Sequence, residues 1–413
     1  MELNPSIADV AEPTRNAQGA TSRFAAAGLP LLIAVAALGG AVMNVILPLL
    51  PTLQVEFGAD YRQVKSALTI FLVGAALAQL TMGPLSDAHG RRPWLLAALA
   101  VFCAGAVMSA VAPSLAMLDL GRLLQGFGGA GSFVLAQAIV FEDSETKTAP
   151  QRIGYLSASI AVGIMVAPVA GAIVSAGLGW RAIFWLAFAA GALLLGVCQR
   201  RIAKAPPRPA GPALASAAAN TATLLRSRPF VGHALCAGLV MANYFCLAAF
   251  GPLIAISVLG LDKIEYGLLF AVLGAGYVGG NLASARLGER IGRRKAAAGA
   301  LALGVVAGLA GAVLLGAGAM GPTAFLVVGC VMAMVTGLVR PGATNAARAA
   351  SSSSTGAAAG LLNFAIYGTG AAVTAGVGFG LDPSGIAAMA ALPVVTVAAL
   401  LAGLWAARGT TEM

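Results

Sequence analysis

The sequence predicts an all-α membrane protein with twelve transmembrane helices in two pseudo-symmetric lobes of six. Three observations support this fold class. Of the 413 residues, 59% are hydrophobic and only 10% are charged, whereas soluble domains carry about 25% charged residues. Long stretches contain no Asp, Glu, Lys or Arg, as expected where a charge at the bilayer centre costs several kcal/mol. A charged loop sequence also recurs, in degenerate form, 202 residues later.

The spans follow from the charge-free stretches, because a helix crosses the hydrocarbon core in about 20 residues. One stretch of 44 residues is interrupted at Gly321-Pro322 and therefore counts as two helices, which gives twelve. The stretches are 24–55, 66–86, 93–118, 123–141, 153–180, 182–199, 229–261, 266–285, 296–339, 349–381 and 383–407. They divide the chain into an N-terminal tail (1–23), a first lobe (24–200), a linker (201–228), a second lobe (229–407) and a C-terminal tail (408–413).

The cations predict the orientation. Nineteen of the 25 Lys and Arg residues fall in the tails and in connections on the same side as the tails. The opposite side holds only Arg62, Lys65, Arg181 and Lys263. The positive-inside rule then puts both termini in the cytoplasm. Because topology accounts for the net charge of +10, we predict no nucleic-acid partner.

Two loops indicate a parallel duplication. Gly83-Pro-Leu-Ser-Asp-Ala-His-Gly-Arg-Arg92 follows span 2, and Ala285-Arg-Leu-Gly-Glu-Arg-Ile-Gly-Arg-Arg294 follows span 8. Without gaps, Asp87 aligns with Glu289, Gly90 with Gly292, and the two Arg pairs with each other. Parallel halves are a known transporter design, although short basic loops on one side of a membrane can also look alike.

Three motifs at successive spans resemble those of the major facilitator superfamily. They are Gly83-x-Leu-x-Asp87-x-x-Gly90-Arg91-Arg92 in loop 2–3, Leu120-Gly-Arg122-Leu-Leu-Gln125-Gly126-x-Gly128 in span 4, and Gly163-x-x-x-Ala167-Pro168-x-x-Gly171 in span 5. The third has Ala167 where the family usually has Gly. Within the superfamily, the first half is most similar to the twelve-span drug–proton antiporters of the bicyclomycin and chloramphenicol exporter group.

The resemblance implies a major facilitator fold and a secondary transporter of the bacterial inner membrane. It implies proton-coupled efflux of small amphipathic molecules or drugs by alternating access, and hence drug resistance. Because one chain contains both lobes, we expect a monomer. The residues expected to act in gating are Gly83, Asp87, Gly90, Arg91, Arg92, Glu289, Arg293, Arg294, Gly163, Pro168 and Gly171. Asp119 and Arg122, three residues apart in span 4, are expected to couple protonation to transport, and they can pair on one helix face.

One residue departs from the antiporter pattern. These antiporters usually carry a carboxylate in the first helix, and Asn44 occupies that position, in a span with no Asp or Glu. An amide binds polar groups but carries no proton. Proton coupling then depends on Asp119 or on His233, or it is absent. The alternatives to drug efflux are an uncoupled facilitator and an importer of a small solute or of a metal ion such as copper.

Polar and aromatic residues inside apolar spans are the expected substrate contacts. These are Asn44, Gln137, Asn243, Tyr244, Asn281, Asn363 and Tyr367. For each amide, a hydrogen bond between helices is the competing interpretation. Arg340 favours an anionic or polar ligand if it faces the cavity, and otherwise it ends span 10.

The sequence offers little for catalysis or for a resident cofactor. It has two His and no GxSxG or HExxH motif, so we predict neither an enzyme nor a cofactor. His233 and Cys236 lie one turn apart, and such soft ligands suit Cu(I). Cys and Met are also ordinary filler of apolar helices, and no CxxC or HxxxH spacing predicts a metal site.

Overall fold

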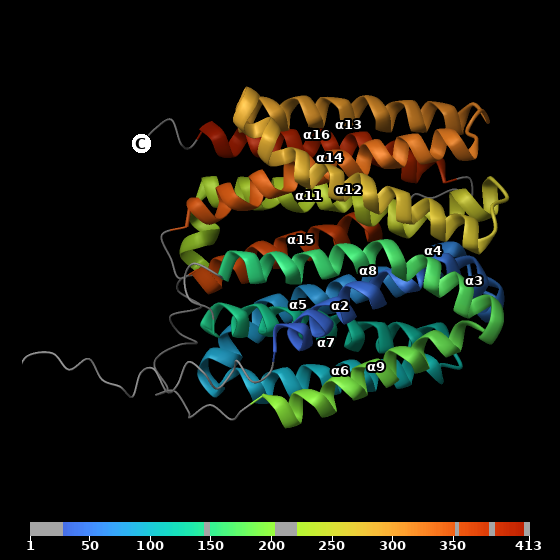
Figure 1. The fold of residues 1–413 in the computed structure, drawn as a ribbon. Helices are drawn as coiled ribbons and strands as arrows, with labels where there is room; N and C mark the ends of the chain where they lie inside the picture. The colour runs from blue at the N-terminus through green and yellow to red at the C-terminus, as the bar shows by residue number, and fades with distance from the viewer. Residues whose placement is uncertain (1–27, 144–148, 203–220, 352–354, 380–384, 409–413) are drawn as a thin grey trace, which may run out of the picture.

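The computed structural model describes residues 28–143, 149–202, 221–351, 355–379 and 385–408. All regular elements within these ranges are helical, and the long helices lie side by side along one direction (Figure 1). The predicted tail 1–23, the middle of the predicted linker and residues 409–413 fall outside these ranges. In chain order the helices are α2 (Leu29–Val45), η2 (Leu47–Leu49), α3 (Leu50–Phe57), α4 (Tyr61–Val64), α5 (Ser66–His89), α6 (Arg91–Ala110), α7 (Leu115–Asp143), α8 (Ala149–Leu178), α9 (Trp180–Arg201), α11 (Arg228–Pro252), η3 (Leu253–Val258), α12 (Lys263–Ile291), α13 (Arg293–Gly316), α14 (Pro322–Ala349), α15 (Thr355–Phe379) and α16 (Ile386–Arg408).

The described residues contain twelve segments that are long and apolar enough to cross a membrane, which confirms the predicted number. The predicted break at Gly321-Pro322 is also correct, because α13 ends at Gly316 and α14 begins at Pro322. Some predicted ends were wrong. The charge-free stretch 93–118 runs across the turn between α6, which ends at Ala110, and α7, which begins at Leu115. A lack of charge indicates burial in the membrane, whereas a helix ends at residues such as proline that interrupt its backbone hydrogen bonds. Asp119 therefore lies inside α7.

The loop repeat has an exact backbone counterpart. Helix α5 ends at His89 and α6 begins at Arg91, while α12 ends at Ile291 and α13 begins at Arg293, an offset of 202 at both bounds. Between them, Gly90 has φ 91° and Gly292 has φ 85°. Only glycine takes such φ values without strain, so both copies need glycine at this position.

A second repeat at the same offset was missed in the sequence. Gly58 (φ 57°) and Gly260 (φ 74°) precede Asp60 and Asp262. Asp60 and Asp262 directly precede α4 and α12. Three residues further on, the Gln63 side chain accepts a hydrogen bond from the N–H of Asp60, and the Glu265 side chain accepts one from the N–H of Asp262. This is the capping-box arrangement that begins a helix.

Glycines bring helices together within each lobe. In the first lobe, a Cβ on Gly126 of α7 would overlap the carbonyl oxygen of Phe71 in α5. In the second lobe, a Cβ on Gly280 of α12 would overlap the carbonyl oxygen of Met334, and one on Gly337 of α14 that of Tyr277. Small residues are the usual means of close helix packing in lipid, which provides no hydrophobic drive between helices.

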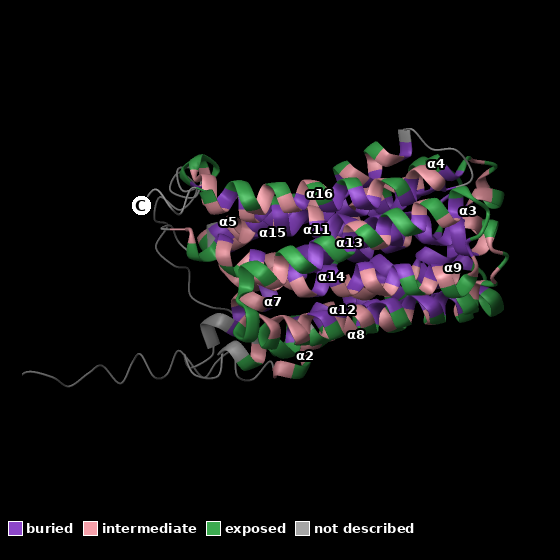
Figure 2. Ribbon diagram, turned by 90° about the horizontal axis from the view of Figure 1, so that it is seen from above, coloured by how far each residue is buried: buried purple, intermediate pink, exposed green. Residues whose placement is uncertain are grey.

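The two lobes meet along α5 with α15 and along α8 with α12, and we call this interface the seam. In Figure 1 the blue-to-green lobe lies below the yellow-to-red lobe. Figure 2 shows buried residues on the inward faces and exposed residues on the outer faces. Large apolar side chains on the outer faces are exposed, among them Leu193 and Val313, as expected where the surrounding solvent is lipid.

Candidate functional site

The centre of the seam between the lobes holds a polar contact. Asn44 of α2 is fully buried, and its Nδ2 donates to the carbonyl of Gly40 at 2.9 Å. Its Oδ1 accepts a hydrogen bond from the hydroxyl of Tyr244 in α11 at 2.7 Å. The predicted contacts Asn44 and Tyr244 therefore bind each other across 200 residues of chain, one from each lobe.

Tyr244 leads to a buried cluster in the second lobe. Its ring lies 6.3 Å from the ring of Tyr277 in α12, centroid to centroid, and 5.8 Å from that of Phe270. The Tyr277 hydroxyl accepts a hydrogen bond from Nη1 of Arg340 in α14. Tyr277 was missed among the predicted contacts, although it lies in the apolar stretch 266–285 and carries the same signal as Tyr244 and Tyr367.

Arg340 does not end its helix. Helix α14 continues for nine residues beyond it, to Ala349, or about 13 Å. The side chain is half-buried and turned toward α12, and it lies near Tyr367 of α15. Tyr367 itself stacks on Phe245, with ring centroids 6.1 Å apart. Helix α14 thus continues past Arg340, whose guanidinium binds a side chain of the neighbouring helix α12.

The other predicted contact residues divide between the seam and the helix packing. Asn363 of α15 donates to Oε1 of Gln79 in α5 at 3.2 Å, which again joins the two lobes. Asn243 donates to Oγ1 of Thr396 at 2.9 Å and so ties α11 to α16 inside the second lobe. Asn281 donates to the Tyr277 carbonyl of its own helix at 3.2 Å, and Gln137 lies half-buried on α7, outside these contacts.

Arg122 is fully buried on α7. Its Nη1 donates to the carbonyl of Val42 at 3.1 Å and to Oε1 of Gln125 at 2.9 Å, and its Nε donates to the carbonyl of Ala67 at 3.2 Å. The guanidinium also lies over the ring of Phe71, 4.5 Å from the centroid. Arg122 thus connects α7 to α2 two residues from Asn44.

Asp119 does not form the ion pair with Arg122 that the three-residue spacing allows. Its Oδ2 instead accepts a hydrogen bond from the hydroxyl of Ser66 at 2.6 Å. Within the described part of the chain, Oδ1 of Asp119 and Nη2 of Arg122 are buried without a hydrogen-bond partner. Such atoms are costly, and two of them lie within one helical turn.

Lys65 is a further correction to the sequence analysis, which counted it among the loop cations. It is only 5% exposed, between α4 and α5. Its Nζ donates to the carbonyl of Thr374 in α15 at 2.7 Å and lies 5.4 Å from the ring centroid of Phe250 in α11. The nearby Tyr61 hydroxyl donates to the carbonyl of Ala249 at 2.8 Å. Both bonds join the lobes at one end of the seam, which we call the far end.

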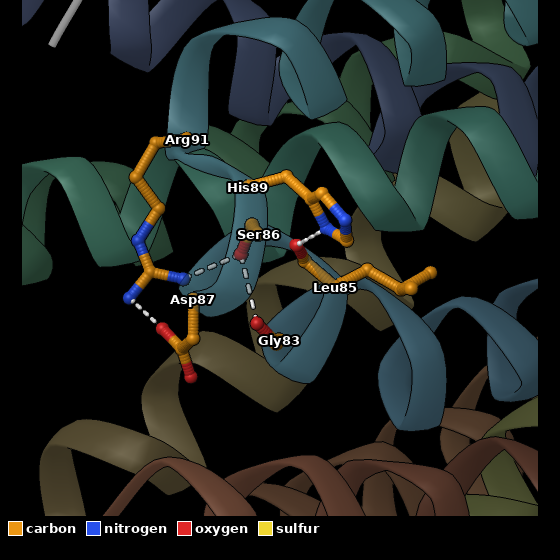
Figure 3. Close-up of polar contacts among 6 residues, drawn as sticks. All are labelled: Gly83, Leu85, Ser86, Asp87, His89 and Arg91. Atoms are coloured by element: carbon orange, nitrogen blue, oxygen red, sulfur yellow. Dashed lines mark hydrogen bonds and ion pairs between the residues drawn. The ribbon is translucent and has the colours of Figure 1, made fainter. Parts of the chain in front are cut away.

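The opposite end carries the arginine-rich loops. Figure 3 shows Asp87 of α5 and Arg91 of α6 facing each other across the turn. Nη2 of Arg91 lies 2.5 Å from Oδ1 of Asp87, and Nη1 of Arg91 donates to the Ser86 hydroxyl. That hydroxyl in turn donates to the carbonyl of Gly83. Arg92 donates to the carbonyl of Gln199 at 2.8 Å. These contacts all stay within the first lobe.

The second copy of this loop lacks the ion pair. Glu289 has no ion pair in the ranges that the structure describes, and Arg293 and Arg294 are exposed. The space that a side chain would need at Gly288 is taken by Arg293. The two copies therefore share a backbone and differ in their charge contacts.

Helix α8 approaches helices of both lobes through its motif residues. A Cβ on Gly163 would lie 3.2 Å from the backbone nitrogen of Ala41, and one on Gly171 would overlap the carbonyl oxygen of Val45, both in α2. On the other side, a Cβ on Gly267 of α12 would lie 3.2 Å from the carbonyl of Pro168. The motif thus allows close backbone contact on both sides of the seam.

Among the described residues, no three His, Cys, Asp or Glu side chains gather in a way that could hold a metal ion. His233 is half-buried on α11, and Cys236 is buried one turn away.

The family model described as Major Facilitator Superfamily matches residues 32–375. A Bacillus subtilis (strain 168) protein described as the uncharacterized MFS-type transporter YdgK is 29% identical over 312 residues, which is 74% of this chain and 77% of that protein. The multidrug resistance protein MdtL of Escherichia coli O81 is 24% identical over 223 residues, or 54% of this chain, and the match spans only about half, 56%, of MdtL.

Solved transporters share the fold at low identity. The transporter PepTSo of the POT family has a TM-score of 0.73 at 12% identity, over 93% of this chain and 98% of that one. A D-xylose–proton symporter has a TM-score of 0.69 at 15% identity, over 92% and 96%. A bacterial homologue of the lysosomal transporter Spinster, solved in an inward-facing state, has a TM-score of 0.69 at 18% identity, over 93% and 97%.

Proposed function

This chain belongs to the major facilitator superfamily, and from that premise we propose that it exports small amphipathic organic molecules in exchange for protons. The family makes it a multi-pass membrane transporter and not an enzyme. The polarity of its substrate, the direction of transport and the coupling to protons belong to the proposal. The contact between Asn44 and Tyr244, made at the seam between the lobes, is the observation that supports a central substrate contact, and the buried residues Asp119 and Arg122 support the coupling.

Alternating access requires contacts that hold one state and separate in the other. The bonds of Lys65 and Tyr61 hold the lobes together at the far end. The pair Asp87–Arg91 lies within one lobe at the other end and leaves the second lobe free to move away. We propose that in the outward-open state the far-end bonds break and Asp87, with the rest of the loop 2–3 motif, engages the second lobe.

The arginine-rich end is proposed to be cytoplasmic, in a bacterial inner membrane, because most cations lie there. On that orientation the structure represents a state closed to the outside. We also propose that one chain is the functional unit, with lobes at 24–200 and 229–407 joined by the linker, since each chain supplies both sides of the seam.

Asp119 and Arg122 are the proposed proton-coupling pair. Each carries a buried polar atom that has no hydrogen-bond partner among the described residues, and the two side chains lie one turn apart on α7. Protonating Asp119 removes a charge beside Arg122 and changes which contacts the guanidinium favours. Those contacts run to Val42 and Ala67, on the two helices that flank the first-lobe side of the seam. Asn44 then serves as a hydrogen-bonding substrate contact rather than as a proton carrier.

Proteoliposomes with an internal pH dye and an imposed proton gradient test this function. Adding ethidium or chloramphenicol is expected to cause proton movement in the wild-type protein. Asp119→Asn is expected to abolish that movement while keeping the Ser66 contact, because an amide oxygen also accepts a hydrogen bond. Glu56→Gln, at an exposed acid of the same lobe, is the matched control and should behave as wild type. Drug flux without proton movement in the wild type would contradict the coupling.

A further inference from the structure

Arg340 lies deep in the membrane-spanning part of α14. The helix has 28 residues, or about 42 Å, and the hydrocarbon core is about 30 Å thick. Arg340 lies about 13 Å from the nearer helix end, and a core centred on the helix would therefore contain it. A guanidinium stays charged in a protein, and a charge at that depth costs several kcal/mol unless it is compensated.

The described helices of the second lobe do not provide the compensating charge. Helices α11, α13, α14, α15 and α16 contain no Asp or Glu. The acids of α12 are Glu265 and Glu289, each twelve residues from Tyr277, or about 18 Å along the helix. No ion pair of Arg340 occurs within the described residues, and its Nε is buried without a hydrogen-bond partner.

The chain nevertheless holds Arg340 in a defined place. The close contact of Gly280 and Gly337 puts α12 against α14 one turn from both side chains. The neutral Tyr277 hydroxyl then accepts from Nη1 of Arg340. A hydroxyl orients a guanidinium but does not neutralise it. The guanidinium of Arg340 therefore remains positively charged and oriented, and it can bind an anion.

A series of aromatic rings leads from this charge toward the other lobe. Tyr277, Tyr244 and Phe270 form one group, and Tyr367 with Phe245 forms another on α15 and α11. Beyond Tyr244, the Asn44 amide belongs to the other lobe. Guanidinium groups bind carboxylates with paired, charge-assisted hydrogen bonds, and ring faces bind an apolar body.

We propose that Arg340 is the anchor for the anionic group of the transported molecule, and that the substrate class is amphipathic organic carboxylates. This inference rests on the proposed transport function and specifies its substrate. The carboxylate would pair with the guanidinium, and the apolar part would lie on Tyr244, Tyr277 and Tyr367. Binding would then change the contact that Tyr244 makes with Asn44, which links substrate to the closure of the seam.

Matched acid and amide pairs test the charge requirement on the full-length protein in detergent at pH 7.5. The probes are benzoate, 4-phenylbutyrate and 2-naphthoate with their amides, and the readout is the rise in thermal unfolding temperature with ligand concentration. At least one acid is expected to act at a concentration about tenfold lower than its amide, as a charge-assisted bond requires. Equal action by the amides, or by inorganic phosphate, would overturn the proposal.

Variants assign the preference to Arg340. Arg340→Gln should abolish the acid-over-amide difference, and Arg340→Lys, which keeps the charge, should retain part of it. Tyr277→Phe should reduce it, because the guanidinium loses its orienting hydroxyl. Arg348→Gln, in the last turn of the same helix, is the control and should leave the difference unchanged. An acid preference that persists in Arg340→Gln would place the anion site elsewhere.

Failure of this inference can be told apart from failure of the proposed function. If ethidium or chloramphenicol drives proton movement but no acid is preferred over its amide, the transport function stands and the carboxylate class is wrong. If an acid is preferred but neither that acid, compared with protein-free liposomes, nor either drug drives proton movement, the anion site stands and the coupled efflux is wrong.

Discussion

Lys65 illustrates how one side chain joins the lobes. It occupies the position in the first lobe that Gly267 occupies in the second, 202 residues later. Lys65 crosses the seam to the Thr374 carbonyl, whereas Gly267 admits the backbone of Pro168 from across the seam. The ammonium has a carbonyl and an aromatic ring as partners only while the lobes touch at the far end.

Lys65→Met should therefore favour opening of the far end. The variant keeps an apolar stem and loses a charged hydrogen bond worth about 1.5–3 kcal/mol, which shifts the balance of states about tenfold or more. The measurement is the rate at which a membrane-impermeant maleimide labels a cysteine at position 249, in a protein whose native cysteines are replaced. Faster labelling is expected. Lys263→Met, at the start of α12, is the control, and an unchanged rate in Lys65→Met would contradict this role.

Single residues in the sequence indicated where polarity lies but not what it contacts. Asn44 stood out as an amide in an apolar span, yet its partner Tyr244 lies 200 residues away. Asn243 carried the same signal and proved to bind Thr396 inside one lobe. Hydrophobic periodicity and composition do not distinguish a contact between the lobes from a contact within one lobe, because both amides need a hydrogen-bond partner in lipid.

At the scale of helices, adjacent glycines have opposite roles. A side chain at Gly280 would meet the backbone of α14, whereas Gly279 has nothing within 4 Å. Gly280 therefore sets the distance between α12 and α14, and with it the contact of Tyr277 with Arg340. Gly279 is a replaceable residue on the outer face of the same helix.

The pair Gly280→Ala and Gly279→Ala tests this difference. Gly280→Ala should destabilise the protein by about 1–3 kcal/mol through overpacking. Gly279→Ala should be neutral or stabilising by up to about 1 kcal/mol, because alanine favours a helix. Thermal unfolding of both variants in detergent is the measurement. Equal effects would mean that the α12–α14 contact does not depend on Gly280.

Helix number was predictable from the sequence, and helix ends were less so. Twelve spans followed from the absence of charge over long stretches, a strong signal because lipid penalises every charge. The helix ends depend on weaker local signals, such as the capping residues Asp60 and Asp262. These residues lie in short loops without a motif that would single them out in the sequence. The repeat at loop 2–3 was detected because its charges recur, whereas the capping repeat was not.

At the scale of the whole molecule, the lobes differ in how their two ends are joined. Hydrogen bonds from Lys65 and Tyr61 cross the seam at the far end. The contact of Asn363 with Gln79 crosses the seam near the middle of α5, while Asp87, at the arginine-rich end, pairs within its own lobe. Asn44 and Tyr244 lie between the two ends of the seam. A ligand that separates these two residues there would affect the contacts at both ends.

The central claim is that the lobes rock about this seam, so that one end opens as the other closes. Spin labels at exposed positions 55 and 258 report on the far end, and labels at exposed positions 155 and 282 report on the other end. Pulsed dipolar distances in nanodiscs, between pH 6 and pH 8 and with the drug that moves protons, measure both pairs. We predict that one distance lengthens while the other shortens. Distances that stay fixed, or that change in the same direction, would contradict alternating access.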